Sequence, residues 1–184
     1  MRELSLHLLD IAENSVNAKA KNVTIFVLED TRSDRLYLSI EDDGVGMSPE
    51  MVAQVTDPFV TTRTTRKVGL GLPLLKGAAE ACNGYLKVQS TLGVGTRVEI
   101  EFQRSHIDRM PLGDLPATIL SLTIGFPAIH WIIRYQVNDN EFVFDSEPIQ
   151  RELEGIPLSD PAVLAFLKEY VETGVSELKP ADSF

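Results

Sequence analysis

The stretch Glu41-Asp42-Asp43-Gly44-Val45-Gly46-Met47 directly follows a β-rich run at residues 36–40 and gives the first indication of the fold. A buried aspartate at the end of a strand can accept a hydrogen bond from an exocyclic amine. The two glycines let the backbone approach a flat ring closely, because they carry no Cβ. An ordinary Asp/Gly turn would explain the same residues. The stretch alone leaves both a ring-binding loop and a simple turn open.

A second stretch, residues 57–72, combines hydroxyl groups, cations and glycines. Residues 58–79 contain no acidic side chain but include Arg63, Arg66, Lys67 and Lys76, in a protein whose net charge is −10. Gly69-Leu70-Gly71 at the start of a helix would present free backbone N–H groups to an anion. The pattern favours a phosphate-binding loop, with a solvated basic loop as the alternative. The P-loop signature is absent from the sequence.

The first helix expected from the sequence, residues 4–20, carries Asp10 and Asn14 four positions apart and therefore on one face. His7 shares that face. A carboxylate and a carboxamide placed in this way could orient a water molecule and complete the oxygen shell of a Mg²⁺ ion. A solvated helix face is the alternative, since Glu13 and Asn17 repeat the same spacing one face over.

Hydrophobic periodicity predicts an α+β fold for the first hundred residues. Helices are expected at residues 4–20, after Pro49 and at 70–82, and strands at 23–28, 36–40, 85–89 and 96–102. This order predicts a two-layer α/β sandwich in which helices stack on one face of a mixed sheet.

Composition divides the chain near residue 105. Residues 1–104 have a net charge of −2 and hold eight of the 12 glycines, whereas residues 105–184 have a net charge of −8 and seven of the 10 prolines. We therefore expect a ligand-binding domain at 1–104 and a separately built, small acidic α+β unit at 105–184. That unit should contain a short helix at 114–122, a hairpin at 129–144 and a closing helix with Ser159 as its N-cap. The hairpin aromatics, Trp131, Tyr135, Phe142 and Phe144, are expected to form a small core.

Charge and composition exclude several classes of protein. A pI of about 4.7 argues against nucleic-acid binding. The sequence has no apolar run of the roughly 20 residues that a membrane helix needs. Cys82 is the only cysteine, and the chain does not open with a secretory leader, so a cytoplasmic location is expected.

The order of these motifs resembles the GHKL ATPase superfamily. An asparagine on a first helix, D-x-G-x-G after a strand, F-x-T-T-R, G-L-G-L at a helix start and G-x-G-T before the last strand match its N, G1, F, G2 and G3 boxes in sequence. The resemblance covers about residues 3–104. It implies the Bergerat ATP-binding fold, with ATP and Mg²⁺ held between the helical layer and a lid.

The resemblance also implies roles for individual residues. Asn14 resembles the Mg²⁺ ligand, Asp42 the adenine-recognising aspartate, and Asp10 stands where ATP-hydrolysing relatives place a water-activating glutamate. The other implied nucleotide contacts are Gly44 and Gly46 beside the aspartate, Phe59, Thr61, Thr62 and Arg63 in the F-box, Arg66 and Lys67 at the phosphates, Gly69 and Gly71 at the lid hinge, and Thr96 in support of adenine.

The resemblance implies ATP binding and leaves two functions open. One is a stand-alone regulatory kinase that transfers the γ-phosphoryl group to a protein partner. The other is a nucleotide-sensing switch or scaffold with weak ATPase activity, whose state is read by a partner or in a homodimer. Whether the protein is an enzyme is therefore open.

Two local resemblances bear on this choice. Residues 13–20 resemble mismatch-repair ATPases, but residues 105–184 are too few and too acidic for a transducer domain, so a DNA clamp is not expected. Residues 105–112 have the spacing of a histidine-kinase phosphoacceptor box around His106. Because Pro111 and Gly113 interrupt a helix there, we expect an interdomain linker.

Overall fold

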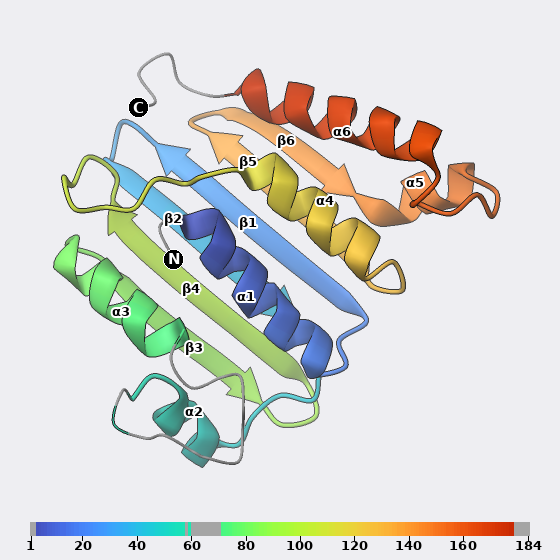
Figure 1. Ribbon diagram of the computed structural model, residues 1–184. Coiled ribbons are helices and arrows are strands. Elements are labelled where there is room, and N and C mark those ends of the chain that lie inside the picture. The colour runs from blue at the N-terminus through green and yellow to red at the C-terminus, as the bar shows by residue number, and fades with distance from the viewer. Residues whose placement is uncertain (1–2, 58, 60–70, 179–184) are drawn as a thin grey trace.

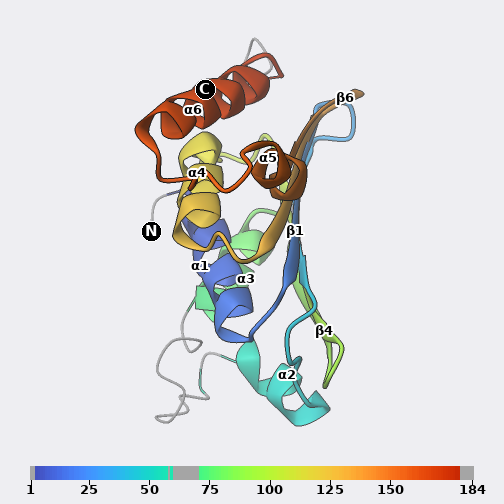
Figure 2. The ribbon, with the colours of Figure 1, turned by 90° about the vertical axis from the view of Figure 1, so that its right-hand side faces the viewer.

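Six strands of the described residues form one open sheet, and the described helices cover one of its two faces (Figures 1 and 2). The structure is a computed structural model and describes residues 3–57, 59 and 71–178. In chain order the elements are α1 (Leu4–Asn17), β1 (Asn22–Asp30), β2 (Arg35–Asp42), α2 (Pro49–Val55), α3 (Gly71–Ala81), β3 (Tyr85–Thr91), β4 (Gly95–Gln103), α4 (Leu115–Gly125), β5 (His130–Val137), β6 (Asn140–Asp145), α5 (Ser146–Glu152) and α6 (Pro161–Ser176). This architecture confirms the predicted α+β sandwich.

The sheet is mixed, with strand order β3-β4-β2-β1-β5-β6. β5 runs parallel to β1, and the other neighbouring pairs of described strands are antiparallel. Parallel pairing requires a crossover connection, which here includes β2, β3, β4 and three helices between β1 and β5. β5 is thus distant in sequence from β1, although the two strands are neighbours in the sheet.

Buried and partly exposed side chains alternate along β1, and this alternation determines which face of the sheet the helices cover. Val23, Ile25 and Val27 are buried under the helices, whereas Phe26 is only half-buried on the opposite face, where its ring lies 6.0 Å from that of Tyr37. Successive side chains of a strand point to opposite faces, so one β-rich run builds both surfaces. The described helices leave the second face open (Figure 2).

The sheet continues across residue 104, where the sequence predicts a boundary between two units. β5 pairs with β1 over eight residue pairs, from Asn22↔His130 to Glu29↔Val137. Trp131, Tyr135 and Phe144 are fully buried in the same hydrophobic cluster as the residues of α1, β1 and β2, while Phe142 packs at its border. The two expected units thus contribute to one sheet, and whether residues 1–104 form a domain that folds alone stays a prediction.

Several helix boundaries differ from those predicted, including the end of α4, which is Gly125 and not residue 122. The N-cap of α6 is Asp160, not Ser159, because the Asp160 carboxylate accepts the N–H groups of Ala162 and Val163. A negative charge there also interacts favourably with the helix dipole. α1 ends at Asn17, three residues early, since Lys19 takes a positive φ of 60°. Among the described helices, none is long and apolar enough to cross a membrane.

Candidate nucleotide-binding site

Asp42 stands at the end of β2 and is held there by two donors. Ser15 Oγ on α1 donates to Asp42 Oδ2 at 2.6 Å, and the Gly44 backbone N–H donates to Asp42 Oδ1 at 2.9 Å. Because Ser15 is buried in the helical layer, the carboxylate lies on the helix-covered side of the sheet. Each carboxylate oxygen keeps a second lone pair, so Asp42 can still accept a hydrogen bond from an amine.

The loop after Asp42 needs glycine at both predicted positions. A Cβ on Gly44 would lie 2.8 Å from the carbonyl oxygen of Ala18. Gly46 has a φ of +70°, and a Cβ there would lie 2.1 Å from the carbonyl oxygen of Thr91. The loop is pinned by a hydrogen bond from the Val45 N–H to Ala18 O. These glycines therefore press the loop against the end of α1 and the end of β3.

Thr96 faces Asp42 across the β2–β4 pair. Its hydroxyl lies 2.8 Å from Ser90 Oγ, and Ser90 Oγ also accepts the Met47 backbone N–H. Thr96 thus joins Ser90 in fixing the far end of the glycine loop. The structure brings Asp42, Gly44, Gly46 and Thr96 together at one end of the sheet, as the motif order predicts.

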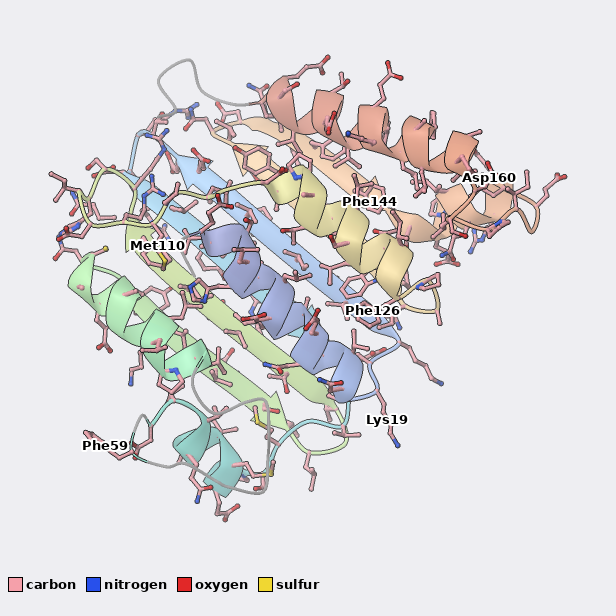
Figure 3. All side chains as sticks on the ribbon, viewed as in Figure 1. Lys19, Phe59, Met110, Phe126, Phe144 and Asp160 are labelled. Carbon is pink, nitrogen blue, oxygen red and sulfur yellow. The ribbon has the colours of Figure 1, made fainter. Side chains whose placement is uncertain are left out.

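Asp10 and Asn14 line a cleft of about 470 Å³ over the outward face of α1. Gly71, Leu72 and Leu75 of α3 line the cleft together with Phe126. α3 lies on one side of α1 (Figure 1), and Phe126, just after α4, lies on the other (Figure 3). Asn14 is the sequence neighbour of Ser15, so α1 connects this cleft directly to Asp42. The structure therefore places the predicted metal ligand and the predicted water-activating carboxylate in one cleft.

The oxygen ligands that the cleft offers suit a Mg²⁺ ion bound together with a nucleotide. Carboxylate and carboxamide oxygens such as those of Asp10 and Asn14 suit Mg²⁺, which keeps several waters and phosphate oxygens in its shell. Among the described residues there is no group of three or more His, Cys, Asp and Glu side chains that could hold a metal alone. The residues present thus fit an ion that the nucleotide itself helps to bind.

His7 forms a buried part of the cleft wall. It is 7% exposed, and its Nδ1 atom has no hydrogen-bond partner among the described residues. Burial lowers the pKa of His7, because desolvation disfavours the charged imidazolium, and the nearby carboxylate of Asp10 acts in the opposite direction. The imidazole is therefore favoured in its neutral form.

Asp42 and Thr96 line a neighbouring hollow and not this cleft, and further predicted contacts are not placed in the cleft by the structure. Phe59 is 91% exposed beside α2, pointing away from α1 (Figure 3), with its backbone N–H bonded to Asp57 Oδ1. The other predicted contacts of this segment lie outside the described residues: Thr61, Thr62, Arg63, Arg66, Lys67 and Gly69.

Ser15 and Ser90 belong to the site but are not among the residues predicted from the motifs. The position of Ser15 could have indicated its role. It follows Asn14 directly on an apolar helix, where a buried hydroxyl group needs a hydrogen-bond partner. Ser90 gave no comparable signal, because it lies in an alternating strand that reads as ordinary β-structure.

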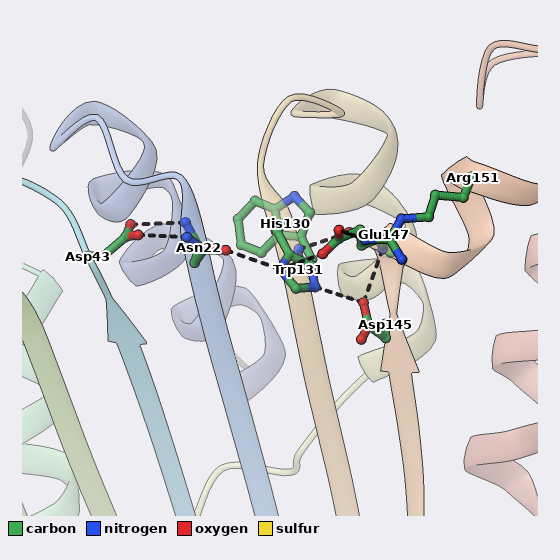
Figure 4. Close-up of polar contacts among 8 residues, drawn as sticks. Asn22, Asp43, His130, Trp131, Asp145, Glu147 and Arg151 are labelled. Atoms are coloured by element: carbon green, nitrogen blue, oxygen red, sulfur yellow. Dashed lines mark hydrogen bonds and ion pairs between the residues drawn. The ribbon is translucent and has the colours of Figure 1, made fainter. Parts of the chain in front are cut away.

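A chain of polar contacts leads from the loop into the C-terminal hairpin (Figure 4). Asp43 accepts the Lys21 and Asn22 backbone N–H groups and the Asn22 side-chain amide. Asn22 Oδ1 lies 3.0 Å from His130 Nδ1, and His130 Nε2 lies 2.8 Å from Asp145 Oδ1. Burial acts to raise the pKa of Asp43, but the donors from Asn22 and Lys21 outweigh it and hold that pKa below its usual value.

The segment around His106 is a turn, as the linker interpretation expects. His106 Nδ1 accepts the backbone N–H of Asp108 at 3.2 Å. The Arg109 guanidinium donates to the carbonyl oxygens of Arg104 and Met110, and is half-buried there. No described helix includes residues 104–114.

The sequence model of the histidine kinase-, DNA gyrase B-, and HSP90-like ATPase family matches residues 2–106. A putative sensor protein of Shewanella frigidimarina is 31% identical over 109 residues, which is 58% of this chain and 17% of that protein. A putative sensor histidine kinase NtrY-like of Rickettsia conorii is 27% identical over 108 residues, 59% of this chain and 18% of the relative. The sensor histidine kinase ZraS of Salmonella typhimurium is 30% identical over 89 residues, 48% and 19% respectively. The matches thus span under a fifth of each of these relatives.

The fold has a solved counterpart that extends past residue 106. The N-terminal domain of a DNA repair protein aligns with 100% of this chain and 58% of its own, with a TM-score of 0.56 and 14% identity. At that identity the likeness concerns the fold alone. The family match covers more than half of the chain and includes Asp10, Asn14, Asp42 and Thr96. The chain therefore belongs to the histidine kinase-, DNA gyrase B-, and HSP90-like ATPase family.

Proposed function

We propose that this protein binds ATP with Mg²⁺ and transfers the γ-phosphoryl group to a His or Ser side chain of a partner protein. The observation that carries the proposal is the geometry of α1, which holds Asp42 through Ser15 and presents Asn14 and Asp10 to the cleft. The sensor-kinase relatives support phosphoryl transfer as the reaction.

Different residues of the site bind the base, the metal ion and the phosphates in this proposal. Asp42 accepts the exocyclic amine of adenine and so selects the base. Asn14 supplies a metal-ligand oxygen, while Asp10 lies one helical turn away, where it can accept a proton from the attacking group. Bound Mg²⁺ neutralises the charge on the transferred phosphoryl group. Arg63, Arg66 and Lys67, outside the described residues, are proposed to contact the phosphates.

A nucleotide-sensing switch is the second candidate, and one observation favours it. The contacts from Asp43 through Asn22 and His130 to Asp145 connect the residue after Asp42 with the hairpin of the C-terminal part (Figure 4). A change in the loop on nucleotide binding would alter this chain of contacts. A partner or a second copy bound at the C-terminal part could then read the state of the site.

Titration calorimetry with ATP and Mg²⁺ tests the shared part of both candidates. Asp42→Asn should weaken binding at least about tenfold, because the amide nitrogen presents donors where adenine needs an acceptor. Asp108→Asn is the matched control, since Asp108 is an exposed aspartate in the turn at the opposite end of the sheet. Equal affinities for the wild type and Asp42→Asn would refute the assignment of this site.

Incubation with γ-labelled ATP and a cell extract separates the two candidates. Label on a partner protein, absent with Asp42→Asn, supports the kinase. Label on the chain itself that is lost in His106→Gln would instead make His106 the acceptor. Without label, nucleotide-dependent capture of a partner supports the switch.

A further inference from the structure

Helix α6 carries two stripes of residues, and only one of them is buried, where the helix packs on α4 and β6. Val163, Leu167, Val171 and Val175 recur every four residues and are buried. A second stripe with the same spacing, Phe166, Tyr170 and Gly174, lies on another side of the helix. Phe166 is 60% exposed and Tyr170 is 42% exposed. Two large aromatic side chains therefore stay in water although their helix already has a buried face.

Phe142 of β6 completes an array of three rings with this stripe. The Phe166 and Tyr170 rings stack at 6.1 Å and 11°, and the Phe142 ring lies 5.6 Å from that of Tyr170. Gly174 makes room for the array, since a Cβ there would lie 2.2 Å from Phe142 Cε2. The rings line an open groove of about 520 Å³ between α6 and β6.

The charge of the groove is negative. Glu169 and Glu177 line it beside the three rings, and none of the described lining residues is basic. Lys168, the nearest cation in sequence, pairs with Glu172 and does not line the groove. Carboxylates next to aromatic faces favour guanidinium or ammonium groups, through ion pairing and cation–π contact. A second copy of this chain would bring like charge to the groove, because residues 105–184 have a net charge of −8.

Through Phe142, the groove borders β6, an edge strand of the sheet. Among the described strands β6 pairs only with β5, so its outer edge presents free backbone groups (Figure 2). Such an edge accepts an added strand, whose backbone supplies the hydrogen bonds while alternate side chains enter neighbouring pockets. Phe142 and Phe144 point to the helical side of β6, so alternate side chains of an added strand would lie toward the groove.

We propose that the groove between α6 and β6 binds an extended, basic segment of a partner protein. The segment adds to the edge of β6, an aliphatic or aromatic side chain packs on Phe166 and Tyr170, and an Arg or Lys reaches Glu169 and Glu177. This site is built from the C-terminal elements α6 and β6, so the proposal does not rest on the proposed function.

Selection from a display library of short randomised peptides, with the full chain as bait, tests the proposal. The selected peptides should be rich in Arg or Lys with hydrophobic residues in alternation. In fluorescence-polarisation titrations, Phe166→Ser combined with Tyr170→Ser should weaken a selected peptide at least about tenfold. Glu169→Gln with Glu177→Gln should weaken it severalfold, and less so at high salt. Hydrogen exchange should slow at the amides of residues 140–145 when the peptide binds.

Leu74→Ser is the matched control, since Leu74 is a 67% exposed apolar residue of α3 on another helix. It should leave peptide affinity unchanged, and all variants should keep the wild-type far-UV circular dichroism spectrum at the temperature of the titration. Selection of uncharged or acidic peptides, no enrichment, or affinity unchanged by the aromatic variants would overturn the proposal. A dimer in sedimentation analysis that the aromatic variants abolish would overturn it in favour of self-association.

Discussion

Ser15 is the residue on which the position of the Asp42 carboxylate depends. We expect Ser15→Ala to weaken ATP binding about fivefold, because losing one hydrogen bond to a charged group costs about 1 kcal/mol when the group keeps its other donor. Calorimetry with ATP and Mg²⁺ measures the change. Ser105→Ala is a close control, since Ser105 Oγ donates to Asp34 Oδ2 at 2.6 Å at the opposite end of β2. Equal loss of affinity in both variants would show that the effect is not local.

Gly46 combines a positive φ with a close approach to β3. Gly46→Ala should lower the free energy of unfolding by about 2–4 kcal/mol, since its Cβ would overlap the Thr91 carbonyl oxygen. Urea denaturation measures the loss. Gly77→Ala is the control: nothing lies within 4 Å of its added Cβ on α3, so it should be neutral or stabilise by up to about 1 kcal/mol. A neutral Gly46→Ala would mean that the loop rearranges freely.

The sequence predicts the residues of the site whose roles depend on local motifs. Asp42, Gly44 and Gly46 form one short pattern after a strand, so their arrangement is encoded within a few residues. Ser15 was missed because its role depends on a partner 27 positions away. Phe59, by contrast, is exposed beside α2, and its contact with a nucleotide stays a prediction, because the motif carries no information on which way that side chain points.

At the level of secondary-structure elements, Asp43 ties the end of β2 to the start of β1. Its lowered pKa stabilises the fold at pH values above the ordinary value of 3.8, and this contribution is lost as the pH falls through the lower pKa of the folded state. We expect Asp43→Asn to cost about 1 kcal/mol at neutral pH, reduced by partial exposure to solvent. Urea midpoints between neutral and acidic pH measure the difference, which should shrink below pH 3.8. A difference that grows on acidification would contradict this role.

Periodicity predicts elements better than it predicts their neighbours. The positions of α1, α3 and the strands of the first hundred residues follow from local patterns. The position of β5 beside β1 does not follow from local patterns. The two strands pair in parallel across a long connection, and the hydrophobic pattern of a strand does not indicate which strand it pairs with. α5 was not predicted either, since seven residues that include Pro148 show no clear helical period.

At the scale of the whole molecule, residues 105–184 complete the layer that carries the site. The Leu4 and Ser5 N–H groups at the start of α1 donate to the Pro111 and Leu112 carbonyl oxygens, and Thr118 Oγ1 on α4 donates to Ser5 O. The first N–H groups of a helix have no acceptor within the helix, and residues 111 and 112 supply acceptors for two of them here. Removal of residues 105–184 would also turn β1 into an exposed edge strand.

A chain that ends at Arg104 should therefore be less stable and bind ATP more weakly than the full protein. We expect its urea midpoint, followed by far-UV circular dichroism, to fall well below that of residues 1–184 or its transition to be lost. The full chain should unfold in one transition, with Trp131 fluorescence and circular dichroism coinciding, because Trp131 lies in the shared core. A fragment 1–104 with the stability and ATP affinity of the full chain would contradict this, and would show that the composition boundary near residue 105 is a true domain boundary.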